Sequence, residues 1–196
     1  MILPIVIFGD PVLRTPCARL TKVTPEIEQL ASDMLETMNN ADGVGLAAPQ
    51  VGTSIQLAVI DVTHAVDRQT YFRVDGVDAP LADHMPLVFI NPVFTAGRAK
   101  DTDTEGCLSF PGVRSKITRA KEIKAQLTLL DGRVINFETD GLLARALQHE
   151  ADHLHGRLFI DRMNAADKAT LKRRLTQMYA EIEEDEREAR RQARKK

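Results

Sequence analysis

The chain has 196 residues, of which 43% are hydrophobic and 28% carry a charge. This composition fits one ordinary globular domain whose core needs no disulfides, and it excludes a disordered or fibrous protein. The formal net charge of −2 disfavours binding of nucleic acid over the whole surface, so we expect no DNA partner. The N-terminal segment lacks the features of a secretory signal, and no run approaches the roughly 18 apolar residues of a membrane span. We therefore predict a cytoplasmic protein without a membrane partner.

The first half of the chain predicts one helix followed by strands. Apolar side chains recur at helical spacing over residues 25–38, behind Thr24 as the N-cap, which predicts an amphipathic helix. Glycines over residues 43–52 indicate a tight irregular loop. Pro92 indicates that the last predicted strand ends there or lies at a sheet edge. The predicted strands cover residues 55–61, 71–74 and 87–91, and residues 64–86 are interpreted as a surface insertion with an extra hairpin.

The second half predicts a hairpin and two helices. Alternating apolar residues on either side of Asp131-Gly132 predict a β-hairpin over residues 122–138. A helix follows over residues 141–154, with Asp140 as its N-cap and Gly156 as its stop signal. A last helix begins near residue 165 and degenerates into a charged tail, acidic first and basic last. Its apolar face consists of Leu171, Leu175, Met178 and Ile182.

The predicted helix at 141–154 contains the sequence His149-Glu150-Ala151-Asp152-His153. Residues four apart share one face of a helix, so both imidazoles can reach one metal ion. Glu150 lies beside them as a candidate general base. The alternative interpretation is a pair of surface histidines flanked by acids.

A catalytic metal site takes about three protein ligands and keeps one position for water. Downstream, His155 and Asp161 are too close in sequence to fit the usual pattern of metalloproteases. Upstream, Cys107 lies between a turn-rich loop and an extended stretch, where a thiolate could face the helix. A small buried side chain is the alternative for this cysteine. Cys17 has no acid or histidine near it in sequence, and we expect it in the core.

Three separated segments, GVGLAAPQ at 43–50, EGCLS at 105–109 and QHEADHLHG at 148–156, resemble the signature motifs of peptide deformylases in order and spacing. The resemblance extends over roughly residues 5–165. It implies an α+β fold in which antiparallel or mixed β-sheets pack around a central HExxH helix. It also implies a single catalytic domain at 1–165, followed by a charged amphipathic helix or tail at 166–196. The implied reaction is hydrolysis of the N-formyl group from formylmethionine of newly made proteins.

The resemblance also implies a role for each matching residue. Cys107, His149 and His153 match the metal ligands, and Glu150 matches the catalytic acid. The oxyanion partners fall on the Gln50 side chain and the Leu108 N–H, the peptide-binding positions are Val44, Gly45, Gly106 and Arg114, and Glu105 braces the cysteine loop. The methionine side chain requires an apolar hole, to which Val44, Leu142 and Ala146 contribute. The departures from the family pattern are Phe110 where isoleucine is commoner, Ala146 where many members carry cysteine, and the long 64–86 insertion.

One divalent metal ion per chain is expected, and the resemblance implies Fe²⁺. The ligand types also accept Zn²⁺, Ni²⁺ or Co²⁺. The expected partners are formyl-Met nascent peptides. The charged tail is either a solvated, fraying helix end or, through its basic end, a docking site for the ribosome. One alternative is a zinc endopeptidase, which would need a third ligand downstream of His153. Another is a non-catalytic relative that binds nascent chains, although such a protein would not need Glu150.

Overall fold

The computed structural model describes residues 1–65 and 71–193, and it has the α+β architecture that the sequence predicts. The helices are α1 (Pro25–Asn40), α2 (Gly141–Leu154) and α3 (Ala165–Ala193). The strands are β1 (Gly45–Ala47), β2 (Leu57–Ile60), β3 (Phe72–Val74), β4 (Val77–Asp78), β5 (Leu87–Ala96), β6 (Lys100–Gly106), β7 (Arg114–Ala120), β8 (Glu122–Leu129) and β9 (Val134–Asp140). In the part of the chain that the structure describes, no helix is long and apolar enough to cross a membrane.

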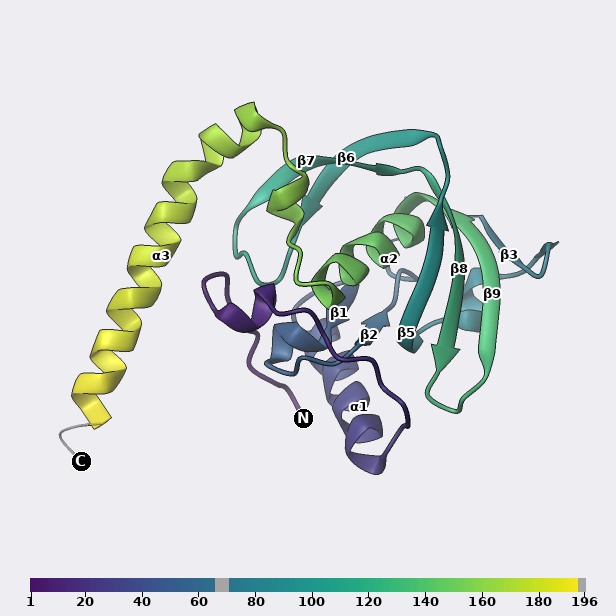
Figure 1. Cartoon of the computed structure of the whole chain (residues 1–196), viewed down its shortest axis with the longest axis horizontal. Coiled ribbons are helices and arrows are strands. Elements are labelled where there is room, and N and C mark those ends of the chain that lie inside the picture. The colour runs from purple at the N-terminus through teal and green to yellow at the C-terminus, as the bar shows by residue number, and fades with distance from the viewer. Residues whose placement is uncertain (66–70, 194–196) are drawn as a thin grey trace.

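Two sheets surround α2 (Figure 1). The larger has seven strands in the order β1-β2-β5-β8-β9-β3-β4, whereas β6 and β7 form a two-stranded sheet of their own. The strand pairs within both sheets are antiparallel. The apolar face of α2 packs on the larger sheet, because Leu143 and Leu147 share a buried cluster with Phe89 and Leu127. Burial of this face fixes the helix at the centre of the molecule.

The predicted hairpin at 122–138 is β8 and β9. Ile123, Ala125 and Leu127 alternate with exposed residues and are buried, as the period of two requires. Gly132 has a φ of 84°, the left-handed conformation that a tight turn needs. This hairpin forms the middle of the seven-stranded sheet.

Several elements differ from the sequence-based expectation. Residues 43–52 form β1 and a short 3-10 turn (Ala48–Val51) instead of an irregular loop. The strand predicted to end near Pro92 continues to Ala96 and is central, pairing with β2 and β8. A shift of register between Ile90 and Val93 accommodates the proline, which has no N–H to donate to a ladder. The hairpin of β6 and β7 was not predicted, because polar residues dominate β6.

The 64–86 insertion contains the expected hairpin, β3 and β4, but it is more than a surface addition. β3 pairs with β9 and extends the large sheet, and Phe72 is buried against Phe137 with ring centroids 4.8 Å apart. Thr24 and Asp140 stand at the predicted N-caps, but neither side chain caps its helix. The Asp140 carboxylate instead accepts a hydrogen bond from the Tyr71 amide at 3.0 Å, which ties the insertion to the start of α2.

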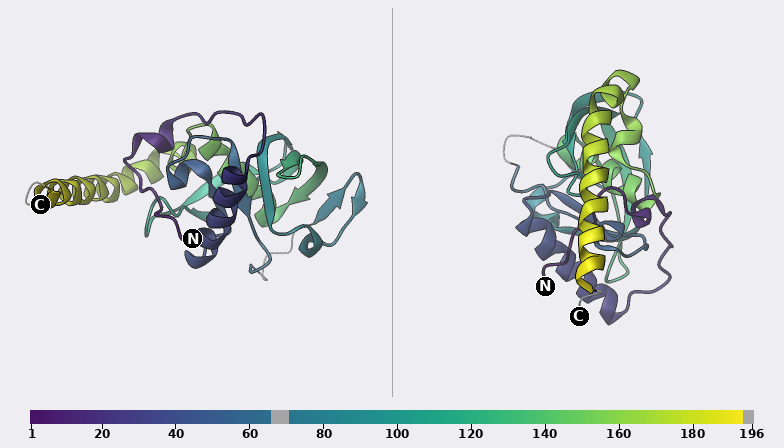
Figure 2. Two further views of the ribbon diagram at one scale, coloured as in Figure 1. Left: turned by 90° about the horizontal axis from the view of Figure 1, so that it is seen from below. Right: turned by 90° about the vertical axis from the view of Figure 1, so that its left-hand side faces the viewer.

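Helix α3 lies on the outside of the molecule (Figures 1 and 2). Leu171, Leu175 and Met178 pack against the N-terminal segment in a cluster that includes Phe8 and Leu13. The side chains of Ile182, Arg190 and Arg191 lie outside the described residues, as do the whole of Arg194, Lys195 and Lys196. The division into residues 1–165 and 166–196 stays a prediction.

Candidate functional site

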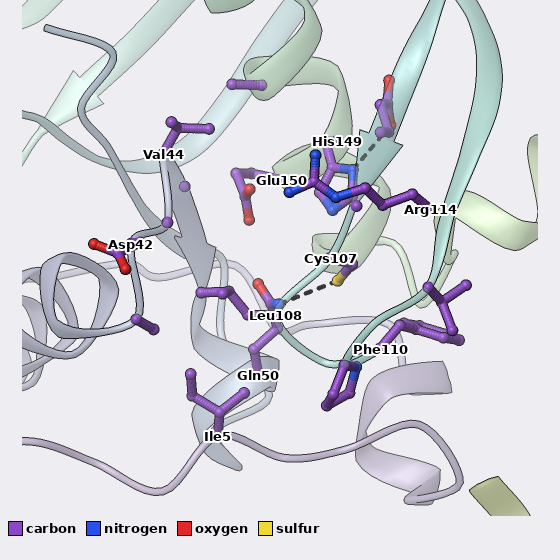
Figure 3. A pocket seen from close by; sticks show the side chains of 18 of the residues that line it. Ile5, Asp42, Val44, Gln50, Cys107, Leu108, Phe110, Arg114, His149 and Glu150 are labelled. Carbon is purple, nitrogen blue, oxygen red and sulfur yellow. Dashed lines mark hydrogen bonds and ion pairs between the residues drawn. The ribbon is translucent and has the colours of Figure 1, made fainter. Parts of the chain in front are cut away.

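A cleft with a volume of about 840 Å³ opens between β1, the β6–β7 hairpin and α2 (Figure 3). It gathers residues from three distant parts of the sequence. The predicted site residues that line it are Val44, Gly45, Gln50, Gly106, Cys107, Leu108, Arg114, Leu142, Ala146, His149 and Glu150. The remaining predicted residue, His153, lies behind them and is 1% exposed.

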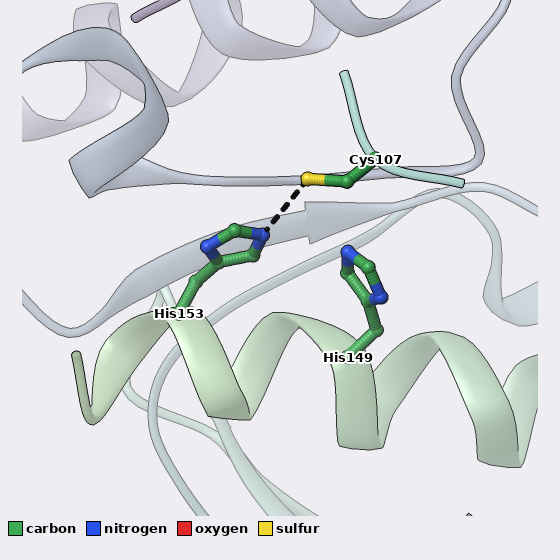
Figure 4. Close-up of side chains that lie close together, drawn as sticks. All are labelled: Cys107, His149 and His153. Carbon is green, nitrogen blue, oxygen red and sulfur yellow. Dashed lines mark hydrogen bonds between the residues drawn. The ribbon is translucent and has the colours of Figure 1, made fainter. Parts of the chain in front are cut away.

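The three predicted metal ligands meet at the inner end of this cleft (Figure 4). His149 and His153 stand one turn apart on α2, and Cys107 follows directly after β6. Each offers one ligand atom, and these atoms lie within 4.8 Å of one another. The Cys107 Sγ lies 3.3 Å from the His153 Nε2. One thiolate and two imidazoles are a donor set that suits Zn²⁺, Fe²⁺ and related ions.

The surroundings of the two rings also fit a metal ion. Glu105 Oε2 lies 3.1 Å from His149 Nδ1, which leaves the other ring nitrogen for an ion, as a carboxylate behind a ligand histidine does. Hydrogen bonds to Cys107 and Glu105 outweigh burial and raise the pKa of His149 to about 10, so an ion bound here would displace a proton. Burial and the neighbouring His149 lower the pKa of His153, which keeps it neutral.

Two other candidate ligands are engaged elsewhere. The His155 Nδ1 lies 2.6 Å from the carbonyl oxygen of Ala151. Asp161 forms an ion pair with Arg14 and accepts a hydrogen bond from the Leu158 amide. Neither His155 nor Asp161 therefore supplies the downstream ligand of an endopeptidase. The third residue of the cluster is Cys107.

Glu150 points into the cleft from α2 and is only 3% exposed (Figure 3). Burial raises the pKa of this carboxyl group to about 7. Within the described residues, its Oε2 and the His153 Nδ1 are buried side-chain atoms without a hydrogen-bond partner. Unpaired buried polar atoms are costly, so the Oε2 of Glu150, a residue that lines the cleft, is suited to a ligand that enters the site.

Gln50 is fixed at the floor of the cleft by a network of hydrogen bonds. Its Oε1 accepts from the Ala47 amide at 2.9 Å, and its Nε2 donates to Cys107 Sγ at 3.5 Å and to Ser109 Oγ at 3.3 Å. The amide donor therefore faces the metal-ligand cluster. Leu108, whose N–H was the second predicted oxyanion donor, also lines this part of the cleft.

The outer cleft combines apolar and polar walls. Val44, Leu142 and Ala146 are apolar residues that line it. Arg114 lies across the cleft from Val44 (Figure 3). Phe110 also borders the cleft, but most of its ring is in the core. It stacks on Phe8 with ring centroids 4.5 Å apart.

A buried charge network beneath the cluster was missed from the sequence, apart from Glu105. Arg119 donates to both Glu105 oxygens, at 2.6 and 2.9 Å, and to Asp152 at 2.8 Å. Arg145 donates to Glu105 at 2.7 Å, and Asp152 also pairs with Arg162. The helical period gave no signal for Arg145, which is buried although it lies two residues from Leu143 and from Leu147 and so off their shared face.

Comparisons with known proteins agree with this geometry. The family model of polypeptide deformylase matches residues 2–169. A peptide deformylase of Methylacidiphilum infernorum is 43% identical over 175 residues, which cover 89% of this chain and 92% of that one. The crystal structure of a peptide deformylase from Thermotoga maritima has a TM-score of 0.71 at 37% identity and covers 84% of this chain and 99% of that one. A peptide deformylase from Synechococcus elongatus, solved in complex with actinonin, has a TM-score of 0.73 at 38% identity and covers 87% of this chain and 85% of that one.

Proposed function

The chain belongs to the polypeptide deformylase family and is a metal-dependent hydrolase of N-formyl groups, and from this premise we propose which residues carry the reaction. The observation that carries the proposal is the cluster of Cys107, His149 and His153 at the inner end of a cleft that also holds Glu150. When bound there, a divalent ion supplies Lewis acidity and makes water a nucleophile near neutral pH.

Glu150 is the general base and acid in this proposal. Its carboxylate accepts a proton from the attacking water and later gives that proton to the amine that leaves. Its burial supports this role, because a proton held there is shielded from bulk solvent. Gly45 lies against the carboxylate and sets its position, since a Cβ at residue 45 would overlap it.

Gln50 and Leu108 stabilise the negative charge that develops on the formyl oxygen. The Gln50 side chain is held on both its oxygen and its nitrogen, so little reorganisation is needed as charge forms. A preorganised donor of this kind is worth about 3 kcal/mol in other oxyanion holes. The second donor is the backbone N–H of Leu108.

The cleft binds the peptide as an extended chain. Val44, Leu142 and Ala146 contact the methionine side chain, because they are apolar residues that line the same cleft as Glu150. Backbone groups of Val44, Gly45 and Gly106 hydrogen-bond the peptide backbone, as in an added β-strand. Arg114 reaches the peptide from across the cleft.

The reaction is tested by release of formate from a formyl-Met tripeptide under anaerobic conditions. The acetyl-Met form of the same tripeptide is the matched control, and we expect no acetate from it. An internal, unformylated peptide tests for endopeptidase activity. Cleavage of the internal peptide by a Cys107→Ala variant would contradict the proposed ligand set.

The native metal is proposed to be Fe²⁺, which one thiolate and two imidazoles can hold. Metal analysis of protein purified without oxygen tests this, with Zn²⁺, Ni²⁺ and Co²⁺ measured in the same sample. Iron below the amount of any of these metals in such a preparation would contradict the proposal.

The second proposed partner is the ribosome, in the cytoplasm, where formyl-Met chains emerge. The C-terminal segment ends in basic residues, including Arg190, Arg191, Arg194, Lys195 and Lys196, and clustered positive charge binds RNA phosphates in a salt-dependent manner. Truncation after Ala180 should weaken sedimentation with ribosomes and leave tripeptide hydrolysis intact. Equal sedimentation of both forms at low salt would contradict this role.

A further inference from the structure

Arg145 joins helix α2 to both strands of the β6–β7 hairpin. Its Nη1 donates to Glu105 Oε1 at 2.7 Å, on β6, and to the carbonyl oxygen of Ile117 at 2.9 Å, on β7. Its Nη2 donates to the carbonyl oxygen and the carboxylate of Asp101, at 3.2 and 3.3 Å. One buried guanidinium from the helix therefore holds the hairpin at several points.

The distance between these two elements decides the geometry of the metal-ligand cluster. His149 and His153 lie on α2, whereas Cys107 follows the last residue of β6. The base of the hairpin continues from β5 and into β8, where the Lys121 amide donates to the carbonyl oxygen of Ala99 at 2.9 Å. Cys107 lies at the opposite end, after Gly106, and there side chains between the hairpin and α2 help to position it, so a displacement there moves the thiolate relative to both imidazoles.

Arg145 also acts on the residue that orients His149. Glu105 Oε1 accepts from both Arg145 and Arg119, while Oε2 lies against the His149 ring. With one oxygen fixed in this way, the carboxylate has one orientation in which to accept from His149. Arg119 still holds both Glu105 oxygens when Arg145 is replaced, so the buried carboxylate keeps a charged partner.

We propose that Arg145 is a positioning residue for the metal site, acting through Glu105 and the β6–β7 hairpin. This role rests on the proposed function of Cys107, His149 and His153 as metal ligands. Arg145 lies one turn before His149 on α2. The arginine and the two proposed histidine ligands therefore belong to one rigid helix.

The test is a titration of metal-free protein with Co²⁺, whose absorption bands report its ligand geometry. Arg145→Met keeps the length of the side chain and removes the donors, and Arg145→Lys keeps the charge with a single ammonium group. Arg73→Met is the matched control, because it breaks the exposed Arg73–Asp78 ion pair at the β3–β4 hairpin. Thermal unfolding of each metal-free variant shows whether the fold persists.

We expect Arg145→Met to bind Co²⁺ about 10- to 100-fold more weakly than wild type, with shifted absorption bands, because loss of outer contacts to a ligand has that effect in other metal sites. Arg145→Lys should fall between, and Arg73→Met should match wild type. In Arg145→Met, the fold-loss of Co²⁺ affinity should also exceed any fold-change in the KM for the formylated tripeptide.

Wild-type affinity and spectrum in a folded Arg145→Met variant would overturn the proposal. A raised KM in that variant would then make Arg145 a substrate-binding residue of the cleft. If Arg145→Met does not fold, Arg145→Lys decides, since one ammonium group cannot hold Glu105 and both strands, and wild-type affinity there overturns the proposal. Failure of the wild type to bind Co²⁺ would instead overturn the metal site itself.

Discussion

Gly45 and Glu150 lie so close together that a Cβ on the glycine would overlap the carboxylate of the glutamate. Gly45 begins β1, and Glu150 lies at the middle of the metal-binding motif on α2. The first motif of the sequence, GVGLAAPQ at 43–50, therefore packs directly against Glu150, the proposed general base. A glycine is needed here for space, and its φ is not in the left-handed region.

The first prediction is that Gly45→Ala lowers kcat/KM by about 100-fold, because a displacement of about 1 Å at a reacting group has that cost. The methyl group must push the Glu150 carboxylate aside, while the three ligand side chains stay in place. Metal content and formate release are measured on the same preparation. Gly76→Asn in the β3–β4 turn is the control, because nothing lies within 4 Å of an added Cβ there and asparagine tolerates its φ of 83°. Full activity of Gly45→Ala would show that Glu150 does not need this position.

The second prediction is that Glu150→Gln retains the metal and the fold but loses a factor of at least about 100 in kcat, the lower range for removal of a general base. The amide has nearly the same shape as the carboxylate but cannot accept the proton. Metal analysis and the thermal unfolding midpoint serve as controls for the site and the fold. Formate release near the wild-type rate by a metal-loaded variant would remove Glu150 from the mechanism.

The third prediction is that Cys17 and Cys107 differ in their reactivity toward a thiol reagent. Burial raises the pKa of the Cys17 thiol to about 11, so almost none of it is thiolate at pH 8. Cys107 lines the cleft and is half-buried. We expect a thiol reagent to label Cys107 alone in folded metal-free protein, and both cysteines in denaturant. Bound metal should protect Cys107, as seen by mass spectrometry of its peptide. Equal labelling with and without metal would argue against Cys107 as a ligand.

The fourth prediction concerns air and the identity of the metal. A ferrous ion with an open position reacts with dioxygen, and the thiolate of Cys107 can be oxidised to sulfenic and then to sulfinic or sulfonic acid. The iron form should lose activity in air, whereas the nickel form should keep it. Formate release is followed during exposure, and the Cys107 peptide is then weighed. An iron form as durable as the nickel form, or decay with neither oxidised Cys107 nor lost iron, would contradict this account.

The sequence by itself determined the features that depend on neighbours along the chain. The spacing of His149 and His153 placed both on one face of a helix, because the helical period is a local property. The alternation around Asp131-Gly132 likewise identified the central hairpin. The three motifs, taken together, identified the family before any contact was known.

Only the tertiary structure decided how distant segments meet. Cys107 and His153 are 46 residues apart, and nothing between them predicts that their side chains lie 3.3 Å apart. The hairpin beside Cys107 has no apolar alternation along β6, and its place depends on buried ion pairs with α2 and on the burial of Ile117 and Ala120 of β7. The contact of Gly45 with Glu150 depends equally on how β1 packs against that helix. Long-range contacts of this kind come from packing of the whole core. They leave no periodic pattern in the sequence from which they could be predicted.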